Sequence, residues 1–194
     1  MNTYSNFLKI RQRGKPIPYG GDGIIREDGD ANYGFKYLKG SSEGLRLLPE
    51  LIRDPALCNL AEAINAIETG LFSVGCVSGA VADENGVRHS GYIEFGFNSK
   101  ALSADACNYF PIFFHFDRSL HESKFDIPVS YQWEIEGASF LEGDHHGFTV
   151  AVFVNTHYCD SVERATANWA SALAALAYYL QSVTTGRTDY IYPQ

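Results

Sequence analysis

Two alternating segments joined by an Asn-Gly turn constrain the fold of this 194-residue chain more than any other feature. Residues 72–80 and 92–97 alternate larger apolar side chains with small or polar ones, and the turn sequence Asp-Glu-Asn-Gly occupies residues 83–86 between them. An Asn-Gly pair between two alternating runs is a strong signal of a β-hairpin. The sequence therefore predicts two antiparallel strands here, with one face of the hairpin exposed to water.

A second pair of strands is predicted nearer the C-terminus. Residues 129–136 alternate apolar and polar side chains, whereas residues 148–154 are apolar on both sides and are predicted to be the most buried strand. A polar turn over residues 142–147 separates the two. The stretch before them, residues 98–128, fits two interpretations. We favour a strand that begins near Pro111; the alternative is a helix from Ser103, which Pro111 would kink.

Helix signals flank these strands on both sides. Asp54 before Pro55 is typical of a helix start, and apolar residues then recur at steps of three and four until Gly70. A shorter helix is expected over residues 43–53. The final helix is predicted to begin at a capping box formed by Asp160 and Glu163, and to continue to residue 186.

These elements predict an α+β fold: a mainly antiparallel sheet of about five strands with helices on one face, and a long C-terminal helix packed on the sheet. Residues 1–40 are predicted to be an irregular N-terminal arm with a short strand near Ile24 and Ile25. Residues 41–186 are expected to form a single domain, followed by a tail over residues 187–194. The order of elements resembles, at fold level only, the helix-grip arrangement, in which a curved sheet wraps a long C-terminal helix around a cavity.

The charge of the chain is −8 and unevenly distributed. Residues 1–21 contain Lys9, Arg11, Arg13 and Lys15 and no acidic residue, which leaves 11 basic and 23 acidic residues in the rest. An acidic body repels phosphate backbones, so we expect no nucleic-acid partner. No apolar run is long enough to span a bilayer and no signal-peptide pattern is present, so we expect a cytoplasmic protein with no membrane partner.

The first of three polar clusters that are candidates for chemistry contains His115, Asp117 and His121. A carboxylate and an imidazole that meet can bind a metal ion or perform acid–base catalysis. The spacing matches no established metal motif, so the competing interpretation is an exposed, solvated face. The four cysteines also lack the close spacing of a zinc ribbon, and we expect free thiols and no cofactor.

The second cluster contains Asp144, His145 and His146. Adjacent histidines in a strand point to opposite faces, so a hydrophilic hairpin loop competes with a divalent-metal site. The third cluster contains His157 and Cys159, two residues apart before the predicted final helix. They are candidates for the base and nucleophile of a hydrolase, and the competing interpretation is a buried thiol beside a helix cap.

Aromatic residues make up 14% of the chain, a surplus typical of binding surfaces and pocket walls. Tyr92, Glu94, Glu134 and Glu136 are expected on water-facing sides of their strands and are candidate binding residues. We therefore predict a non-catalytic binding or interaction protein whose acidic, aromatic-rich surface or pocket receives a basic protein, such as a toxin, or a small apolar ligand. The alternatives are a metal-dependent or Cys–His hydrolase and a helix-grip-like carrier of a small apolar ligand. Whether the chain is an enzyme, and its oligomeric state, stay open.

Overall fold

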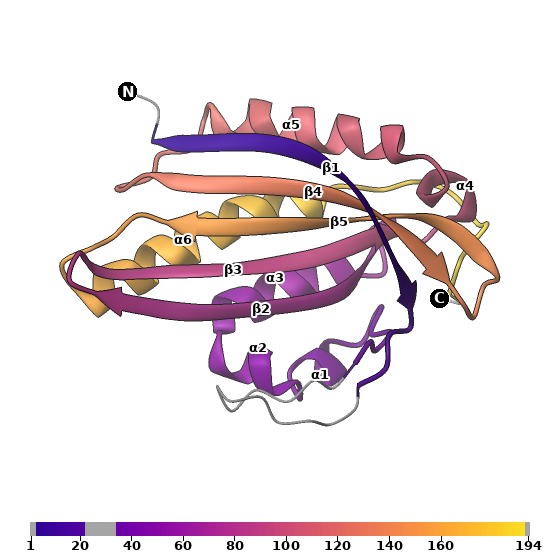
Figure 1. The fold of residues 1–194 in the computed structure, drawn as a ribbon, viewed down its shortest axis with the longest axis horizontal. Coiled ribbons are helices and arrows are strands. Elements are labelled where there is room, and N and C mark those ends of the chain that lie inside the picture. Colours follow the sequence, from indigo (N-terminus) through magenta and orange to yellow (C-terminus); the bar gives the residue numbers. More distant parts are fainter. Residues whose placement is uncertain (1–2, 22–33, 193–194) are drawn as a thin grey trace.

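The computed structural model describes residues 3–21 and 34–192, and its strands form one five-stranded sheet in the order β1-β4-β5-β3-β2 (Figure 1). The strands are β1 (Tyr4–Ile17), β2 (Leu71–Asp83), β3 (Gly86–Phe97), β4 (Val129–Phe140) and β5 (His145–Thr156). The helices are α1 (Ser42–Leu45), α2 (Pro49–Arg53), α3 (Pro55–Asn65), α4 (Lys100–Ser103), α5 (Phe110–Leu120) and α6 (Val162–Leu180), with a 3-10 turn at Ala106–Tyr109. The protein is therefore an α+β protein, as the sequence predicts.

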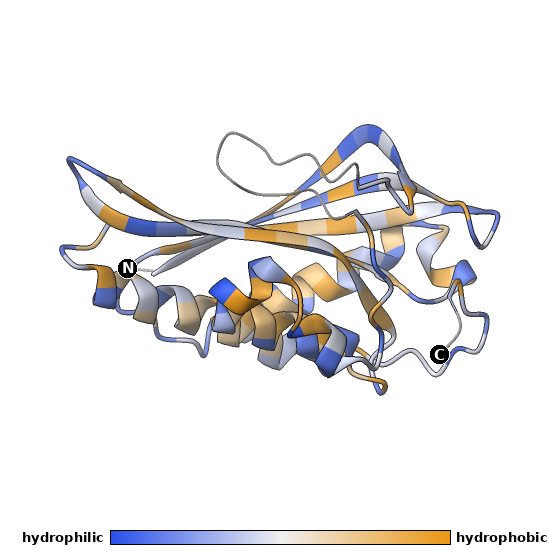
Figure 2. Ribbon diagram, turned by 90° about the horizontal axis from the view of Figure 1, so that it is seen from below, coloured by the Kyte–Doolittle hydropathy of each residue, from blue (hydrophilic) through white to orange (hydrophobic). Residues whose placement is uncertain are grey.

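The helices lie together on one side of the sheet, which Figure 2 shows from below. Every second residue of β4 points toward them, and Tyr131, Trp133 and Ile135 are fully buried. The Tyr131 hydroxyl donates a hydrogen bond of 2.9 Å to the Ala172 carbonyl of α6. The predicted packing of the C-terminal helix on the sheet is confirmed, and the buried stripe of α6 consists of Ala165, Asn168, Trp169, Ala172, Leu173, Leu176 and Leu180.

Both predicted hairpins are confirmed, but the sheet is mixed rather than mainly antiparallel. Strands β2 and β3 pair antiparallel, as do β3 and β5 and also β4 and β5. Strand β1 runs parallel to β4, from Tyr4 opposite Val129 to Ile17 opposite Phe140, with a register shift between Ile10 and Gly14. A parallel pair needs a long crossover connection. Because the segments that pair are distant in the sequence, the local hairpin signals do not predict it.

Strand β1 also corrects the prediction of an irregular arm over residues 1–40. Its Gly14 and Pro16 read as loop signals, but β1 is an edge strand, where a proline breaks no shared ladder. The strand predicted near Ile24 and Ile25 lies outside the described residues.

Residues 110–120 form helix α5 instead of the strand that the alternation around Pro111 favours. Pro111 lies in the first turn of the helix, where its missing N–H leaves no hydrogen bond unmade. The buried side of α5 carries Ile112, Phe113 and Phe116 at helical spacing, whereas Phe114 is 63% exposed. The apolar residues are so dense here that periods of two and of 3.6 both fit the sequence.

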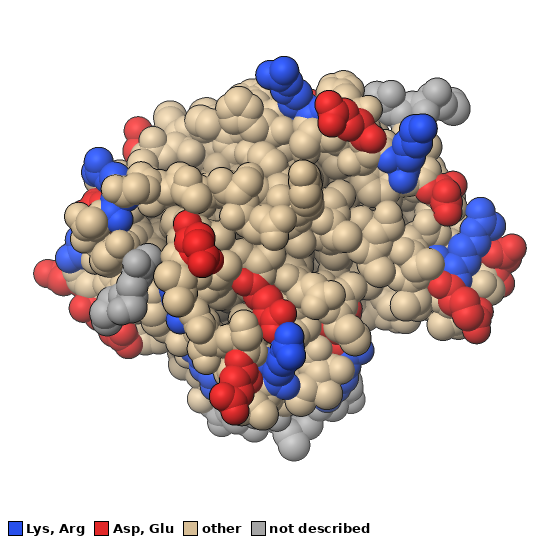
Figure 3. Space-filling view, turned by 180° about the vertical axis from the view of Figure 1, so that it is seen from behind, with Lys and Arg blue, Asp and Glu red and all other residues tan. Residues whose placement is uncertain are grey.

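The two ends of α6 differ in detail from the prediction. The N-cap is Ser161, whose Oγ accepts a hydrogen bond of 3.3 Å from the Arg164 N–H, rather than Asp160. The helix ends at Leu180, and the following tail packs on the fold through the buried Tyr192, whose ring lies 5.3 Å from that of Phe72. The sequence has no charged residue from 165 to 186, and the helix side of the molecule has a broad uncharged area (Figure 3).

No helix in the described part of the chain combines the length and the apolar character needed to cross a membrane.

Candidate functional site

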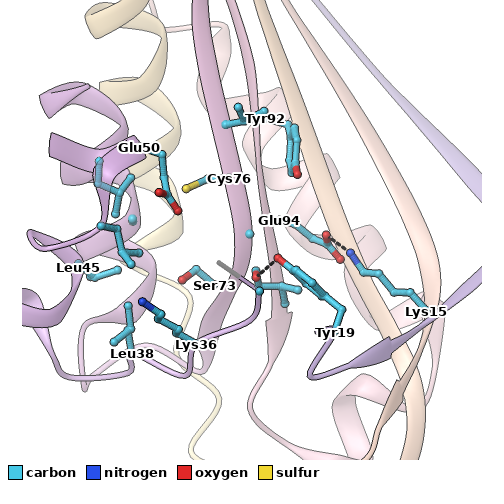
Figure 4. Close-up of a pocket in the computed structure, with 17 residues that line it drawn as sticks. Lys15, Tyr19, Lys36, Leu38, Leu45, Glu50, Ser73, Cys76, Tyr92 and Glu94 are labelled. Carbon is cyan, nitrogen blue, oxygen red and sulfur yellow. Dashed lines mark hydrogen bonds and ion pairs between the residues drawn. The ribbon is translucent and has the colours of Figure 1, made fainter. Parts of the chain in front are cut away.

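A cavity of about 370 Å³ lies beside the first half of β2 (Figure 4). Its walls come from the end of β1, the segment around residues 34–38, helices α1 and α2, and strands β2 and β3. A register shift between Ser73 and Gly75 displaces Val74 from the regular ladder, and such bulges redirect side chains next to binding sites. The cavity volume is in the range of small-molecule sites.

One wall of the cavity is apolar and consists of leucines. Leu45 of α1, Leu48 between the two helices and Leu51 of α2 recur at steps of three, and Leu38 completes the wall. Leu45 and Leu51 are almost fully buried. All four leucines line the cavity, so this wall presents an apolar surface to it.

The opposite wall is polar and is organised around Glu94 of β3. The Glu94 side chain is buried, with the residue only 5% exposed, yet its carboxylate has two partners. The ammonium of Lys15, from the end of β1, forms an ion pair with it, and the Thr149 hydroxyl donates a hydrogen bond of 2.6 Å to the other oxygen. Tyr19 donates a hydrogen bond of 3.0 Å to the Val74 carbonyl. Buried charge is tolerated here because it is paired.

Two titratable groups in the cavity stay protonated at neutral pH. Burial raises the pKa of the Cys76 thiol to about 12, with the carboxylates of Glu50 and Asp54 adding to the effect. Burial also raises the pKa of the Tyr19 phenol above its usual value, with smaller contributions from Tyr92, Glu94, Cys76 and Glu50. A general base works best with a pKa near the operating pH, and a nucleophilic thiol with a lowered one. Neither group is therefore suited to act as a general base or as a nucleophile.

The cavity adjoins the face of the sheet that points away from the helices. The strand registers align side chains across this face in rows, one of which is Phe7–Gln132–Phe153–Tyr92–Val77 and the next Lys9–Glu134–Ala151–Glu94–Gly75. The rings of Tyr92 and Phe153 lie 5.3 Å apart. We call this surface the open face.

The four candidate binding residues lie together on the open face. Tyr92 and Glu94 line the cavity, and Glu134 and Glu136 lie on β4, two strands away from β3. Glu134, only 1% exposed, pairs with Arg11 of β1 at 2.6 Å, and Glu136 lies 3.7 Å from the same guanidinium. The carboxylates of Glu94, Glu134 and Glu136 therefore all lie beside basic side chains of β1.

The first polar cluster is not assembled into a site. His115 and Asp117 lie two residues apart on helix α5, and such residues point to nearly opposite sides of a helix. Asp117 accepts a hydrogen bond of 3.1 Å from the Asn6 side chain, and the His121 ring is 3.2 Å from the Tyr4 hydroxyl. Each of these two side chains therefore has a separate partner on β1.

The His157 and Cys159 side chains also do not meet. The buried Cys159 sulfur lies 3.7 Å from the backbone carbonyl of His157 and 3.5 Å from the Asn168 amide nitrogen. The His157 ring is exposed and packs edge-on against Tyr158 at 6.5 Å. The thiol occupies a packing position at the start of α6.

His145 and His146 point to different partners, as expected for neighbours in a strand. The His145 ring is 2.8 Å from the Ser103 hydroxyl, and the His146 ring is 3.0 Å from the Ser139 hydroxyl. Within residues 3–21 and 34–192, no group of three or more His, Cys, Asp and Glu side chains is arranged to hold a metal ion.

Sequence reasoning missed most of the cavity. Lys15, Tyr19, Lys36 and Leu38 come from segments predicted to be an irregular arm, and the wall that they complete depends on contacts across the fold. A signal for part of this was present, since the basic residues between 9 and 15 recur at every second position, the period of a strand.

Comparisons of the chain with protein-family models, with curated proteins and with solved structures found no significant match.

Proposed function

We propose that this protein is a non-catalytic binding protein and that the cavity beside β2 receives a small amphiphilic molecule. The observation that carries the proposal is the division of the cavity into a leucine wall and a hydrogen-bonding wall. Small-molecule sites combine a mostly apolar lining with a few polar groups that fix the orientation of the ligand. The apolar part of the ligand would contact Leu38, Leu45 and Leu48, and its polar part would face Tyr19 and Tyr92.

The charges in the cavity support a ligand that is neutral or zwitterionic. The ionisable lining contains two lysines, Lys15 and Lys36, and two glutamates, Glu50 and Glu94, whose formal charges cancel. A ligand with a large net charge would lose its hydration without a matching excess of opposite charge. The protonated Tyr19 and Cys76 add polar groups to the lining without adding charge.

The other functions predicted from the sequence have less support. A basic protein partner would use exposed carboxylates, but Glu94 and Glu134 are buried and paired with Lys15 and Arg11. A hydrolase needs its nucleophile and base within hydrogen-bonding reach, and the side chains of His157 and Cys159 point to different partners. A helix-grip-like carrier would hold its ligand under the C-terminal helix, whereas the cavity lining contains no residue of α6.

Native mass spectrometry of the purified protein tests the proposal. We expect an added organic mass that is lost in the variant Leu48→Arg, because a charged side chain from the leucine wall would fill the cavity. The matched control is Leu47→Arg, since Leu47 is the neighbouring residue, is 72% exposed and does not line the cavity. The control should keep the added mass.

If the native spectrum contains the bare chain only, a fragment screen by NMR decides the question. Compounds that shift the resonances of Tyr19 and Tyr92 in the wild type but not in Leu48→Arg would support the proposal. The absence of any such compound, or equal loss of binding in Leu47→Arg, would contradict it.

A further inference from the structure

The edge of the sheet formed by β2 has two halves that differ in how their outward backbone groups are satisfied. Along the first half, side chains from other elements replace a neighbouring strand. Lys39 Nζ donates to the Leu71 carbonyl at 2.7 Å, Asn65 Oδ1 accepts from the Ser73 N–H at 3.2 Å, and Tyr19 donates to the Val74 carbonyl. This half of the edge is closed to another chain.

The second half of β2, residues 77–83, has no such cover. These residues are exposed apart from the partly exposed Ser78. In the part of the chain that the structure describes, the backbone of residues 77–83 hydrogen-bonds only within the β2–β3 hairpin. Figure 1 shows α1 and α2 beside the first half of the strand, and no described element beyond its second half. We call residues 77–83 the free edge.

The free edge also lacks the devices that normally prevent strands from pairing between molecules. Natural edge strands carry Lys, Pro or inward-pointing charges for this purpose. The sequence from Val74 to Ala82 contains no charged residue and no proline. Unpaired N–H and C=O groups in such a segment are a template for an additional strand, and β-strand addition is a common mode of protein recognition.

The chemistry of the free edge fits a second copy of this chain better than a different partner. The protein carries a net charge of −8, so the repulsion between two copies is smallest when the surfaces in contact carry no charge. Residues 77–82 of the free edge are uncharged, and antiparallel pairing about a two-fold axis sets them against the same residues of the other copy. Val77 and Val81 lie on one face of the free edge, and Ser78, Ala80 and Ala82 on the other, so small side chains meet on both faces.

We propose that two copies of the protein associate through antiparallel pairing of their free edges, which joins two five-stranded sheets into one of ten strands. Seven paired residues span about 23 Å of strand. Pairing of this length buries less surface than a standard stable interface of about 1,200–2,000 Å², so the dimer is weak and depends on concentration.

Analytical ultracentrifugation between about 5 and 500 µM protein tests the proposal, since association follows mass action. The wild type is expected to shift from the mass of one chain toward that of two. The variant Gly79→Lys/Val81→Lys should raise the dissociation constant at least tenfold, because like charges then face each other across the pair. A Cβ at Gly79 would meet open space and Val81 is exposed, so both substitutions fit the folded chain.

The matched control is Ser5→Lys/Phe7→Lys, which adds the same charges at exposed positions two residues apart on β1, the opposite edge. It should dimerise like the wild type. Mixing Gly79→Lys/Val81→Lys with Gly79→Glu/Val81→Glu should restore association, because opposite charges then meet.

Hydrogen exchange provides a readout that does not depend on the variants. Amides of residues 77–83 should become more protected as the wild-type concentration rises, and amides of β1 should not. A wild type that stays a monomer over the whole range, a lysine variant that dimerises unchanged, or protection that does not depend on concentration would each overturn the proposal.

Discussion

The two edges of the sheet, β1 and β2, are built from different side chains and are protected in different ways. Along β1, basic residues recur at every second position from Lys9 to Lys15, and Pro16 follows. Two of these cations also neutralise carboxylates of the open face, since Arg11 pairs with Glu134 and Lys15 with Glu94. Along β2, side chains of other elements satisfy the first half, whereas the second half is uncharged up to Ala82 and has no neighbouring strand on its outer side among the described residues.

The basic residues of β1 thus serve two purposes at this edge strand. A charged edge resists unwanted pairing. The basic residues of β1 also allow the carboxylates of Glu94 and Glu134 to be buried in the sheet. Burying a carboxylate without a paired cation would be strongly unfavourable. Strand β2 carries no charged residue before Asp83, so no charge along its free edge opposes pairing with another strand.

The largest effect is expected at β1, from Arg11→Met. The substitution leaves the buried Glu134 carboxylate without its cation, and we expect a loss in the free energy of unfolding, measured by urea denaturation, that exceeds the losses from the two substitutions described next. The double variant Arg11→Met/Glu134→Met should recover most of the loss, because it removes both charges. Arg13→Met, an exposed neighbour on the same strand, should change stability by less than about 0.5 kcal/mol. Equal effects of Arg11→Met and Arg13→Met would show that the pair with Glu134 does not stabilise β1.

A smaller loss is expected at the closed half of β2, from Lys39→Met. Lys39 Nζ donates to the carbonyls of Ala66, Thr69 and Leu71 at 2.6–2.7 Å. Removing it leaves buried acceptors without a donor, which should lower the free energy of unfolding by about 2 kcal/mol. Lys9→Met, at an exposed lysine of β1, is the control, and its effect should stay within about 0.5 kcal/mol. If Lys39→Met is as mild as this control, water satisfies the carbonyls instead.

The smallest effect on stability is expected from His89 in β3, the strand that pairs with β2. His89 of β3 pairs with Ala80, and its ring stacks on Trp169 at 5.7 Å. Burial lowers the pKa of His89 below its usual 6.5, with Asp54 partly opposing the shift. The folded protein therefore holds fewer protons on this ring than the unfolded chain, so its contribution to stability is complete above about pH 6.5 and is lost as the pH falls further.

Urea denaturation between about pH 5 and 8 measures this contribution, which should stay below about 1 kcal/mol because solvent reaches the partly buried ring. His89→Phe keeps the stacking and should flatten the decline at acidic pH. His146→Phe, at an exposed histidine, should leave the profile unchanged. A decline that is identical in all three proteins would assign the acid sensitivity to other groups.

Much of the fold could be predicted from the sequence because its signals are local. The Asn-Gly turn predicts the β2–β3 hairpin, and the spacing of Trp169, Leu173, Leu176 and Leu180 predicts the buried stripe of α6. The prediction of a strand from Pro111 was wrong, because Phe113, Phe114 and Phe116 fit both the period of a strand and that of a helix. The exposed position of Phe114 is determined by which residues the sheet covers, and no short window of sequence contains that information.

The candidate site could be predicted only in part, for the same reason. The sequence placed Tyr92 and Glu94 on a water-facing side of a strand; both line the cavity, but Glu94 is buried rather than facing water. Lys15, which pairs with Glu94, and Tyr19, which also lines the cavity, are more than 70 residues away in the chain, in a segment whose Gly and Pro content is typical of a loop.

By itself, the sequence determined the hairpins, the main helices and the uncharged character of β2, because steric preference and side-chain period act over a few residues. The tertiary structure alone decided that β1 pairs parallel with β4, that Lys15 meets Glu94, and that a cavity forms between the leucines of α1 and α2 and strand β2. These contacts join distant segments. Their formation depends on the surface that the whole fold buries and on the entropy of closing long loops, which no local pattern specifies.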